Sequence, residues 1–160
     1  MDGLVGADLS REELGSLADE LERDRPYYAE SGGGVTFSGG EPLNHAAFLA
    51  ECLDACRTRG LHTAVDTSGF APSEVVLDIA RRTDLVLYDV KHMDPAAHEA
   101  RTGVGNDRIL NNLRELSERT DTEIWICMSL IAGCHHDVEN LGRLARFVVS
   151  LPRRYPRFVQ

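Results

Sequence analysis

A glycine pair followed by an acid and a proline, Gly39-Gly40-Glu41-Pro42, is the first stretch of the sequence whose residue types suit chemistry. Glycine lets a backbone approach a ligand closely and adopts positive φ at little cost, and Pro42 biases Glu41 towards an extended conformation. The Glu41 carboxylate and the nearby backbone carbonyls are then suited to accept hydrogen bonds from the ammonium group of a ligand. An ordinary turn between a strand and a helix has the same composition, so both interpretations stay open at this point.

Polar residues also follow two later apolar runs of the sequence. The stretch Asp66-Thr67-Ser68 comes directly after one run, and Asp89 lies near the end of the next, just before Lys91. Residues two apart on a strand share a face, so Lys91 can balance the charge of Asp89. A structural ion pair at the edge of a sheet is the alternative to a ligand-binding role.

Four cysteines are present, and two of them, Cys52 and Cys56, lie four residues apart in a helical pattern. Such residues share one face of a helix, and reduced cysteines pack as small buried hydrophobes. No third cysteine stands near this pair, which argues against an iron–sulfur cluster there. The stretch Cys134-His135-His136-Asp137 contains zinc-ligand types, but adjacent residues seldom chelate one tetrahedral ion. We expect a loop there, with Asp137 as a helix N-cap, and assign no metal ligand.

Segments of alternating strand and helix periodicity separate the polar stretches. Strands are expected at residues 35–37, 61–65, 85–90 and 123–130, and helices at residues 11–24, 45–59, 72–82, from Asp94 onwards, and around 109–116 and 138–148. Strands alternating with helices imply right-handed βαβ units and a parallel sheet, whose ligands lie beyond the carboxyl ends of the strands. The predicted fold class is α/β, a partial parallel (β/α) barrel of about four βα units, because a closed barrel takes roughly 250 residues. Residues 1–160 are expected to form one domain.

The chain has 160 residues and a formal net charge of -9. Nucleic-acid-binding proteins usually carry a basic stripe, so this balance argues against a nucleic-acid partner. The sequence contains no apolar run of about 18 residues, the length that a membrane helix needs, and no secretory signal in its first residues. Cysteines without a disulfide framework fit a reducing compartment, so a cytoplasmic location is expected.

Residues 33–43, which include the Gly39-Gly40-Glu41-Pro42 loop, closely resemble a segment of the activating enzymes of glycyl-radical enzymes. These enzymes, of which the pyruvate formate-lyase activating enzymes are one group, belong to the radical S-adenosylmethionine (SAM) superfamily. Their G-G-E-P motif holds the amino group of the cofactor. Further stretches match in the same order, and they are residues 65–70, residues 87–94 with a D-x-K pattern, residues 102–104 followed by Asn106, and residues 109–113.

The resemblance implies roles for the polar residues described above. Gly39, Gly40 and Glu41 would contact the methionine end of S-adenosylmethionine, and the ends of the next two strands would form a polar, cation-binding or substrate-facing site beside it. The implied cofactor-binding residues are Gly39, Gly40, Glu41, Asp66, Thr67, Ser68, Asp89 and Lys91. No catalytic residue is assigned to the chain.

The chain departs from the family pattern in two places. Family members carry a C-x3-C-x2-C motif after their first strand, and its thiolates bind three irons of a [4Fe-4S] cluster, whereas here no cysteine precedes Cys52. In the fourth strand, Cys127 takes the place of the usual arginine and His136 that of an asparagine, and a thiol cannot pair with a carboxylate in fork geometry. The expected cofactors are S-adenosylmethionine and, for the family, a [4Fe-4S] cluster whose cysteine ligands this sequence lacks.

The activity implied for the family is the generation of a glycyl radical on a partner enzyme by a 5'-deoxyadenosyl radical. We expect the chain to be an activating enzyme truncated at both ends, without the cluster-bearing first strand and the last strands, and inactive alone. Two alternatives stay open. One is half of a split activating enzyme, and the other is a non-enzymatic module that binds S-adenosylmethionine or the partner. The sequence does not identify the partner glycyl-radical enzyme.

Overall fold

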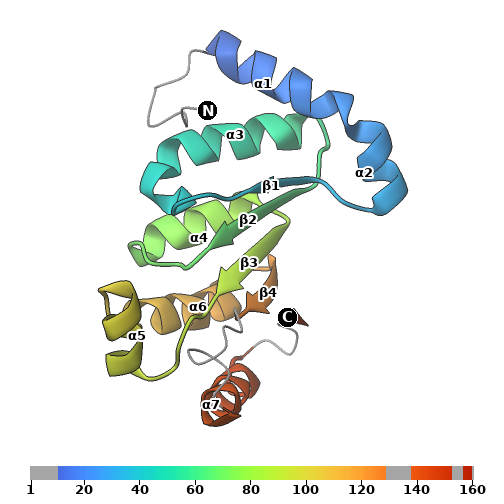
Figure 1. Ribbon diagram of the computed structural model, residues 1–160. Coiled ribbons are helices and arrows are strands. Elements are labelled where there is room, and N and C mark those ends of the chain that lie inside the picture. Colours follow the sequence, from blue (N-terminus) through green and yellow to red (C-terminus); the bar gives the residue numbers. More distant parts are fainter. Residues whose placement is uncertain (1–10, 129–137, 153–156, 160) are drawn as a thin grey trace.

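Five parallel strands lie side by side in chain order in the described part of the chain, which comprises residues 11–128, 138–152 and 157–159 of the computed structural model (Figure 1). The strands are β1 (Val35–Phe37), β2 (Thr63–Thr67), β3 (Leu85–Asp89), β4 (Glu123–Cys127) and β5 (Arg157–Val159). In register, Val65 lies opposite Val86, which lies opposite Ile124. A strand order that follows the sequence without reversal is that of a (β/α) barrel wall, so the predicted partial parallel barrel is confirmed.

The helices of the described residues connect these strands and lie mostly along one side of the sheet (Figure 1). They are α1 (Arg11–Arg23), α2 (Arg25–Ser31), the 3-10 helix η1 (Pro42–His45), α3 (Ala46–Thr58), α4 (Ser73–Arg82), α5 (Pro95–Thr102), α6 (Asp107–Arg119) and α7 (Val138–Val149). Helix α3 packs against α4, and α4 packs against α6. Right-handed crossovers that always step in the same direction place their helices on one face of the sheet.

The two faces of the sheet differ in burial. On the helix-covered face Val65, Tyr88 and Ile126 are fully buried. On the opposite face Asp66 is exposed, and its register partner Leu87 is half-buried. Because side chains alternate along a strand, the acidic side chains at the strand ends share the face that the helices do not cover.

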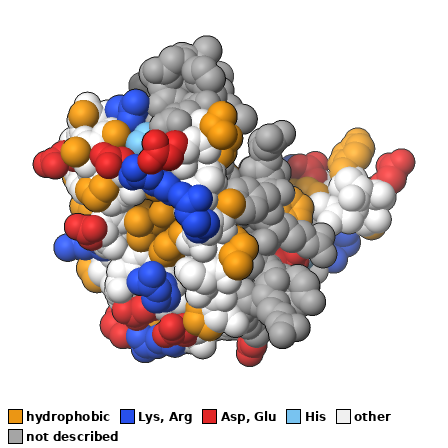
Figure 2. Space-filling view, turned by 90° about the horizontal axis from the view of Figure 1, so that it is seen from below, with side chains coloured by type: hydrophobic (Ala, Val, Ile, Leu, Met, Phe, Trp, Pro, Cys, Tyr) orange, Lys and Arg blue, Asp and Glu red, His pale blue; other side chains and the backbone are white. Residues whose placement is uncertain are grey.

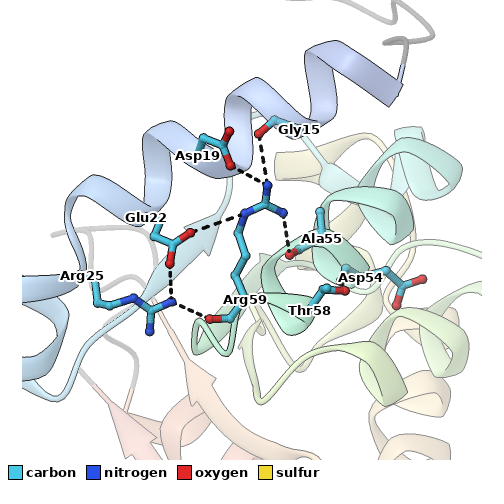
Figure 3. Close-up of polar contacts among 8 residues, drawn as sticks. All are labelled: Gly15, Asp19, Glu22, Arg25, Asp54, Ala55, Thr58 and Arg59. Atoms are coloured by element: carbon cyan, nitrogen blue, oxygen red, sulfur yellow. Dashed lines mark hydrogen bonds and ion pairs between the residues drawn. The ribbon is translucent and has the colours of Figure 1, made fainter.

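Helix α1 is attached to the end of α3 by a group of polar contacts around Arg59 (Figure 3). The Arg59 guanidinium donates to Asp19 at 2.6 Å and to the carbonyl of Gly15 at 3.4 Å, and it forms an ion pair with Glu22 at 3.6 Å. Arg25, at the start of α2, donates to Glu22 at 3.0 Å and to the backbone carbonyl of Arg59 at 2.5 Å. These contacts fix the N-terminal helices on the outside of the βα layer, away from the strand ends.

The surface is a mixture of charges. Side chains of both signs are interspersed around hydrophobic ones on the face seen from below (Figure 2). Two arginines lie over aromatic rings, Arg108 at 5.1 Å from the centre of the Phe70 ring and Arg114 at 5.3 Å from that of Phe147. In the described residues, no helix combines the length and the apolar character needed to cross a membrane.

Several boundaries differ from the sequence-based expectation. Strand β2 begins at Thr63 rather than at residue 61 and includes Asp66 and Thr67. Its pairing with β1 starts with the bond from Val35 N to the carbonyl of His62, at 2.9 Å, which joins Val35 to Thr63. The helix expected from residue 45 is preceded by η1, for which Glu41 is the N-cap residue. Strand β4 ends at Cys127, and the predicted loop at 134–137 with Asp137 as N-cap lies outside the described residues.

One helix was not expected. Helix α2 has no buried residues, so no apolar periodicity reveals it. The short strand β5 follows the four βα units at the edge of the sheet, which fits the predicted partial barrel.

Candidate cofactor-binding site

The Glu41 carboxylate connects the first polar loop with the end of β2. Its Oε1 accepts from the Thr67 hydroxyl at 2.5 Å and from Leu43 N at 3.2 Å. Its Oε2 accepts from the hydroxyl of Ser68 at 2.5 Å and from Ser68 N at 3.0 Å. Both oxygens are thus engaged by the protein itself. Glu41 fastens the two loops together, and the ligand contact that the resemblance implied for it stays a prediction.

The two loop glycines differ in what they require. Gly39 has a φ of 98°, which side chains disfavour. Gly40 has no positive φ, and a Cβ added to either residue would meet no atom within 4 Å. Among residues 11–128, 138–152 and 157–159, no side chain therefore fills the space next to these two Cα atoms, which leaves room for a ligand to approach the backbone.

Asp89 and Lys91 form the ion pair that their spacing predicted. The ammonium Nζ of Lys91 donates to Oδ2 of Asp89 at 2.6 Å. The other oxygen, Oδ1, is buried and has no hydrogen-bond partner among the described residues. A buried carboxylate oxygen without a donor is costly, so this atom is suited to receive a hydrogen bond from a cationic group brought by a ligand.

Asp66 lies close enough to Asp89 for the two charges to interact. Desolvation at the sheet edge is the largest effect that raises the pKa of Asp66, although its side chain is exposed overall, and the carboxylates of Asp89 and Glu41 raise it further. The charge of Lys91 acts in the opposite direction. Three acids and one lysine thus share this edge, and the local excess of negative charge favours a ligand that carries an ammonium group.

A cavity of about 280 Å³ adjoins this edge. Three predicted site residues, Glu41, Ser68 and Lys91, contribute to its lining. The rest of its wall comes from Asn44, Phe70, His98, Thr102, Val104 and Ile109. Sequence reasoning did not assign these six to the site. The signal that pointed to four of them was the family match, which includes Phe70, Thr102, Val104 and Ile109.

The described cysteines do not fit an iron–sulfur cluster. Cys52 and Cys56 are buried and free, as predicted, and burial raises the pKa of Cys52 to about 11. Cys127 is half-buried beside Asp66 and Asp89, and burial followed by these two charges raises the pKa of its thiol. Within the described residues no group of three or more His, Cys, Asp or Glu side chains could hold a metal ion. S-Adenosylmethionine, in contrast, fits the open glycine loop and the unpaired Asp89 oxygen.

Comparison with known proteins gives consistent matches. The model of the radical SAM superfamily matches residues 8–148. The trans-4-hydroxy-L-proline dehydratase activating enzyme of Clostridioides difficile is 42% identical over 139 residues, which are 86% of this chain and 45% of that protein. The choline trimethylamine-lyase activating enzyme of Oleidesulfovibrio alaskensis is 41% identical over 135 residues, 84% of this chain and 43% of that protein. The chain thus spans somewhat less than half the length of these curated relatives.

Solved structures agree with the sequence matches. A domain of pyruvate-formate lyase-activating enzyme from Bacteroides vulgatus superposes with a TM-score of 0.71 at 43% identity, covering 78% of this chain and 76% of that chain. Streptococcus suis SuiB, at 19% identity and a TM-score of 0.66 over 88% of this chain and 31% of that chain, shares the fold. The chain therefore belongs to the radical SAM superfamily and, within it, to the family of the activating enzymes of glycyl-radical enzymes.

Proposed function

We propose that this chain binds the methionine end of S-adenosylmethionine at the carboxyl edge of its sheet. The binding residues are Gly39, Gly40, Glu41, Asp66, Thr67, Ser68, Asp89 and Lys91. The observation that carries the proposal is the Asp89–Lys91 pair with its unpaired buried Oδ1. The methionine end has one ammonium and one carboxylate group, and an adjacent carboxylate and ammonium of the protein match both charges.

The whole protein's activity is proposed from the family. Its relatives are named as activating enzymes of several different glycyl-radical enzymes, and we propose that the parent activity here is the formation of a glycyl radical on such a partner. Bound S-adenosylmethionine would supply the 5'-deoxyadenosyl group for that chemistry. The three-cysteine motif is not among these 160 residues, so the cluster ligands would have to come from another segment or another chain.

The same absence favours one second candidate. A module that binds S-adenosylmethionine or the partner without radical chemistry needs the site edge but no cluster. Both candidates share the expectation that these 160 residues alone form no stoichiometric [4Fe-4S] cluster, and reconstitution with iron and sulfide under anaerobic conditions tests it. We also propose a cytoplasmic location. Cys52 and Cys56 are free thiols, which fits a reducing compartment.

Calorimetric titration with S-adenosylmethionine tests the binding role. Without a cluster iron to chelate the methionine end, we expect a dissociation constant near 1 mM, or about -4 kcal/mol. Asp89→Asn should abolish measurable binding because it removes the charge that receives the ammonium. Glu118→Gln, at an exposed position of α6, is the matched control and should leave it unchanged. Equal affinities for the parent and Asp89→Asn would refute the assignment.

A further inference from the structure

Three buried asparagines lie outside the set of predicted site residues. Asn106, Asn112 and Asn140 are each 1% exposed. Asn106 immediately precedes α6, Asn112 lies within α6, and Asn140 lies in α7. Burial of a side-chain amide is costly unless its hydrogen bonds are made, so the partners of each amide show what the residue does.

Asn112 holds the loop that follows β2, residues 68–72. Its Nδ2 donates to the carbonyl of Gly69 at 2.8 Å and to that of Ala71 at 2.9 Å. Its Oδ1 accepts from the Ser73 hydroxyl at 2.7 Å, which fixes the orientation of the amide. Gly69 has a φ of 70°, and a Cβ there would collide with the Tyr88 hydroxyl. The loop that begins with the site residue Ser68 is thus held from both sides.

Asn106 and Asn140 hold the loop that follows β3, residues 90–94. Nδ2 of Asn106 donates to the carbonyl of His92 at 2.8 Å, and Oδ1 of Asn140 accepts from Met93 N at 2.9 Å. These contacts come directly after Lys91, whose ammonium group reaches back to Asp89. The backbone that carries the lysine is therefore fixed by two elements that are distant in sequence.

Asn106 occupies the N-cap position of α6, yet its side chain makes no capping hydrogen bond. Its Oδ1 is buried without a partner among the described residues. An N-cap asparagine usually stabilises its helix by accepting a backbone hydrogen bond through that oxygen. Here the side-chain amide instead donates to the carbonyl of His92. This hydrogen bond stabilises the loop and not the helix.

We propose that Asn106, Asn112 and Asn140 are positioning residues that hold the two site loops in the geometry that binds S-adenosylmethionine. The inference rests on the proposed function for its ligand, but the loop contacts themselves are independent of it. Each asparagine acts through a backbone group one or two residues from Ser68 or Lys91: Asn112 through Gly69, Asn106 through His92 and Asn140 through Met93.

Aspartate variants separate positioning from general stability. An ionised aspartate has nearly the shape of asparagine but only accepts hydrogen bonds. Asn106→Asp and Asn112→Asp therefore lose the donors to the loop carbonyls, whereas Asn140→Asp keeps the acceptor for Met93 N. Asn111→Asp is the matched control, because Asn111 is exposed on α6 and donates to Glu115 at 3.1 Å. All variants are made in the full chain and compared at pH 8.

The first readout is native-state hydrogen exchange of amides that the asparagines do not bond themselves. Ser68 N, bonded to Glu41, and Gly69 N, bonded to Thr67, should exchange at least about tenfold faster in Asn112→Asp, relative to the global unfolding rate measured on the same sample. Asp94 N, bonded to His92 Nδ1, should respond in the same way to Asn106→Asp.

The second readout is the dissociation constant of S-adenosylmethionine from an NMR titration. Residues that orient metal ligands typically change metal affinity by about 10- to 100-fold when they are replaced. By analogy we expect at least a tenfold loss of affinity in Asn106→Asp and Asn112→Asp. Asn140→Asp and Asn111→Asp should stay within about twofold of the parent. Ser73→Ala removes only the contact that orients the Asn112 amide, and it is the milder variant if Asn112→Asp does not fold. It should accelerate the hydrogen exchange of Ser68 N and Gly69 N to a smaller extent.

Each outcome decides one claim. Equal losses in all three buried aspartate variants, in proportion to their global stability, would overturn the positioning role. Unchanged affinity in variants whose loops exchange faster would overturn it as well. If the parent chain does not bind S-adenosylmethionine at all, the proposed function fails, while the exchange pattern still shows whether the asparagines hold the loops.

Discussion

Replacing Glu41 tests whether the first two loops are joined as the structure shows. Its carboxylate accepts four hydrogen bonds, two from hydroxyls at 2.5 Å and two from backbone amides at 3.0 and 3.2 Å. Hydrogen bonds to a charged group contribute about 1.5–3 kcal/mol each, but these four share one half-buried carboxylate that water can partly replace. We therefore expect Glu41→Ala to lower the free energy of unfolding by about 2–3 kcal/mol, well below the sum of the four.

Glutamine at the same position gives a sharper result. Glu41→Gln keeps one acceptor oxygen but turns an amide donor towards the backbone N–H of either Ser68 or Leu43, and an N–H group cannot accept a hydrogen bond. We expect a loss of about 1–2 kcal/mol. In a double-mutant cycle with Ser68→Ala, the interaction energy should be about 1 kcal/mol, as for residues in one hydrogen-bond network.

Urea unfolding followed by circular dichroism measures these values, with an unchanged m-value as the condition for comparing them. Glu118→Ala, at an exposed glutamate of α6, is the control and should stay within about 0.5 kcal/mol of the parent. If Glu41→Ala is as stable as this control, the Glu41 carboxylate does not join the loop after β1 to the end of β2 in solution.

The remaining predictions concern single residues of the same edge and core. Gly69→Ala should cost more than about 2 kcal/mol, because its φ is 70° and the new Cβ would collide with Tyr88. Gly40→Ala, which meets no atom within 4 Å, should change stability by less than about 0.5 kcal/mol while weakening S-adenosylmethionine binding, as calorimetry would show. The raised pKa of Asp66 means that the folded state binds this proton more tightly, so its contribution to stability falls as the pH rises above 3.8. Asp66→Asn should accordingly raise the free energy of unfolding at pH 7, with the gain shrinking towards pH 3; a loss at pH 7 would contradict this. The thiols of Cys52 and Cys56 should resist iodoacetamide at pH 7 in the folded chain and react in denaturant, with Cys127 reacting faster, as peptide mapping would reveal.

The features that could be predicted from the sequence are those set by local spacing. The alternation of strands and helices follows from periodicity, and the Asp89–Lys91 ion pair follows from the i, i+2 spacing of two residues at the end of β3. Burial of Cys52 and Cys56 follows from their place on the apolar side of α3. In each case the pattern lies within a few residues of the group it describes.

The features that could not be predicted depend on contacts between distant segments. Two partners of Glu41, Thr67 and Ser68, are 26 and 27 residues away, so the sequence showed an acid suited to a ligand and not the contact that joins one loop to the next. The contacts of Asn112 and Asn140 could not be predicted either, because their loop partners lie more than 40 residues away. The roles of the eight proposed site residues and the single-domain organisation remain predictions.

The edge formed by the ends of β1, β2 and β3 is where we propose that the methionine end of S-adenosylmethionine binds. An NMR titration of the isotopically labelled chain tests this site, with S-adenosylmethionine added to about 10 mM, roughly tenfold above the expected dissociation constant. We expect saturable amide shifts centred on Gly39, Gly40, Ser68 and Lys91, and we expect them to disappear in Asp89→Asn. Shifts centred on the opposite end of the strands, around Gly34 and His62, or the lack of any saturable shift, would show that the ligand does not bind at this edge.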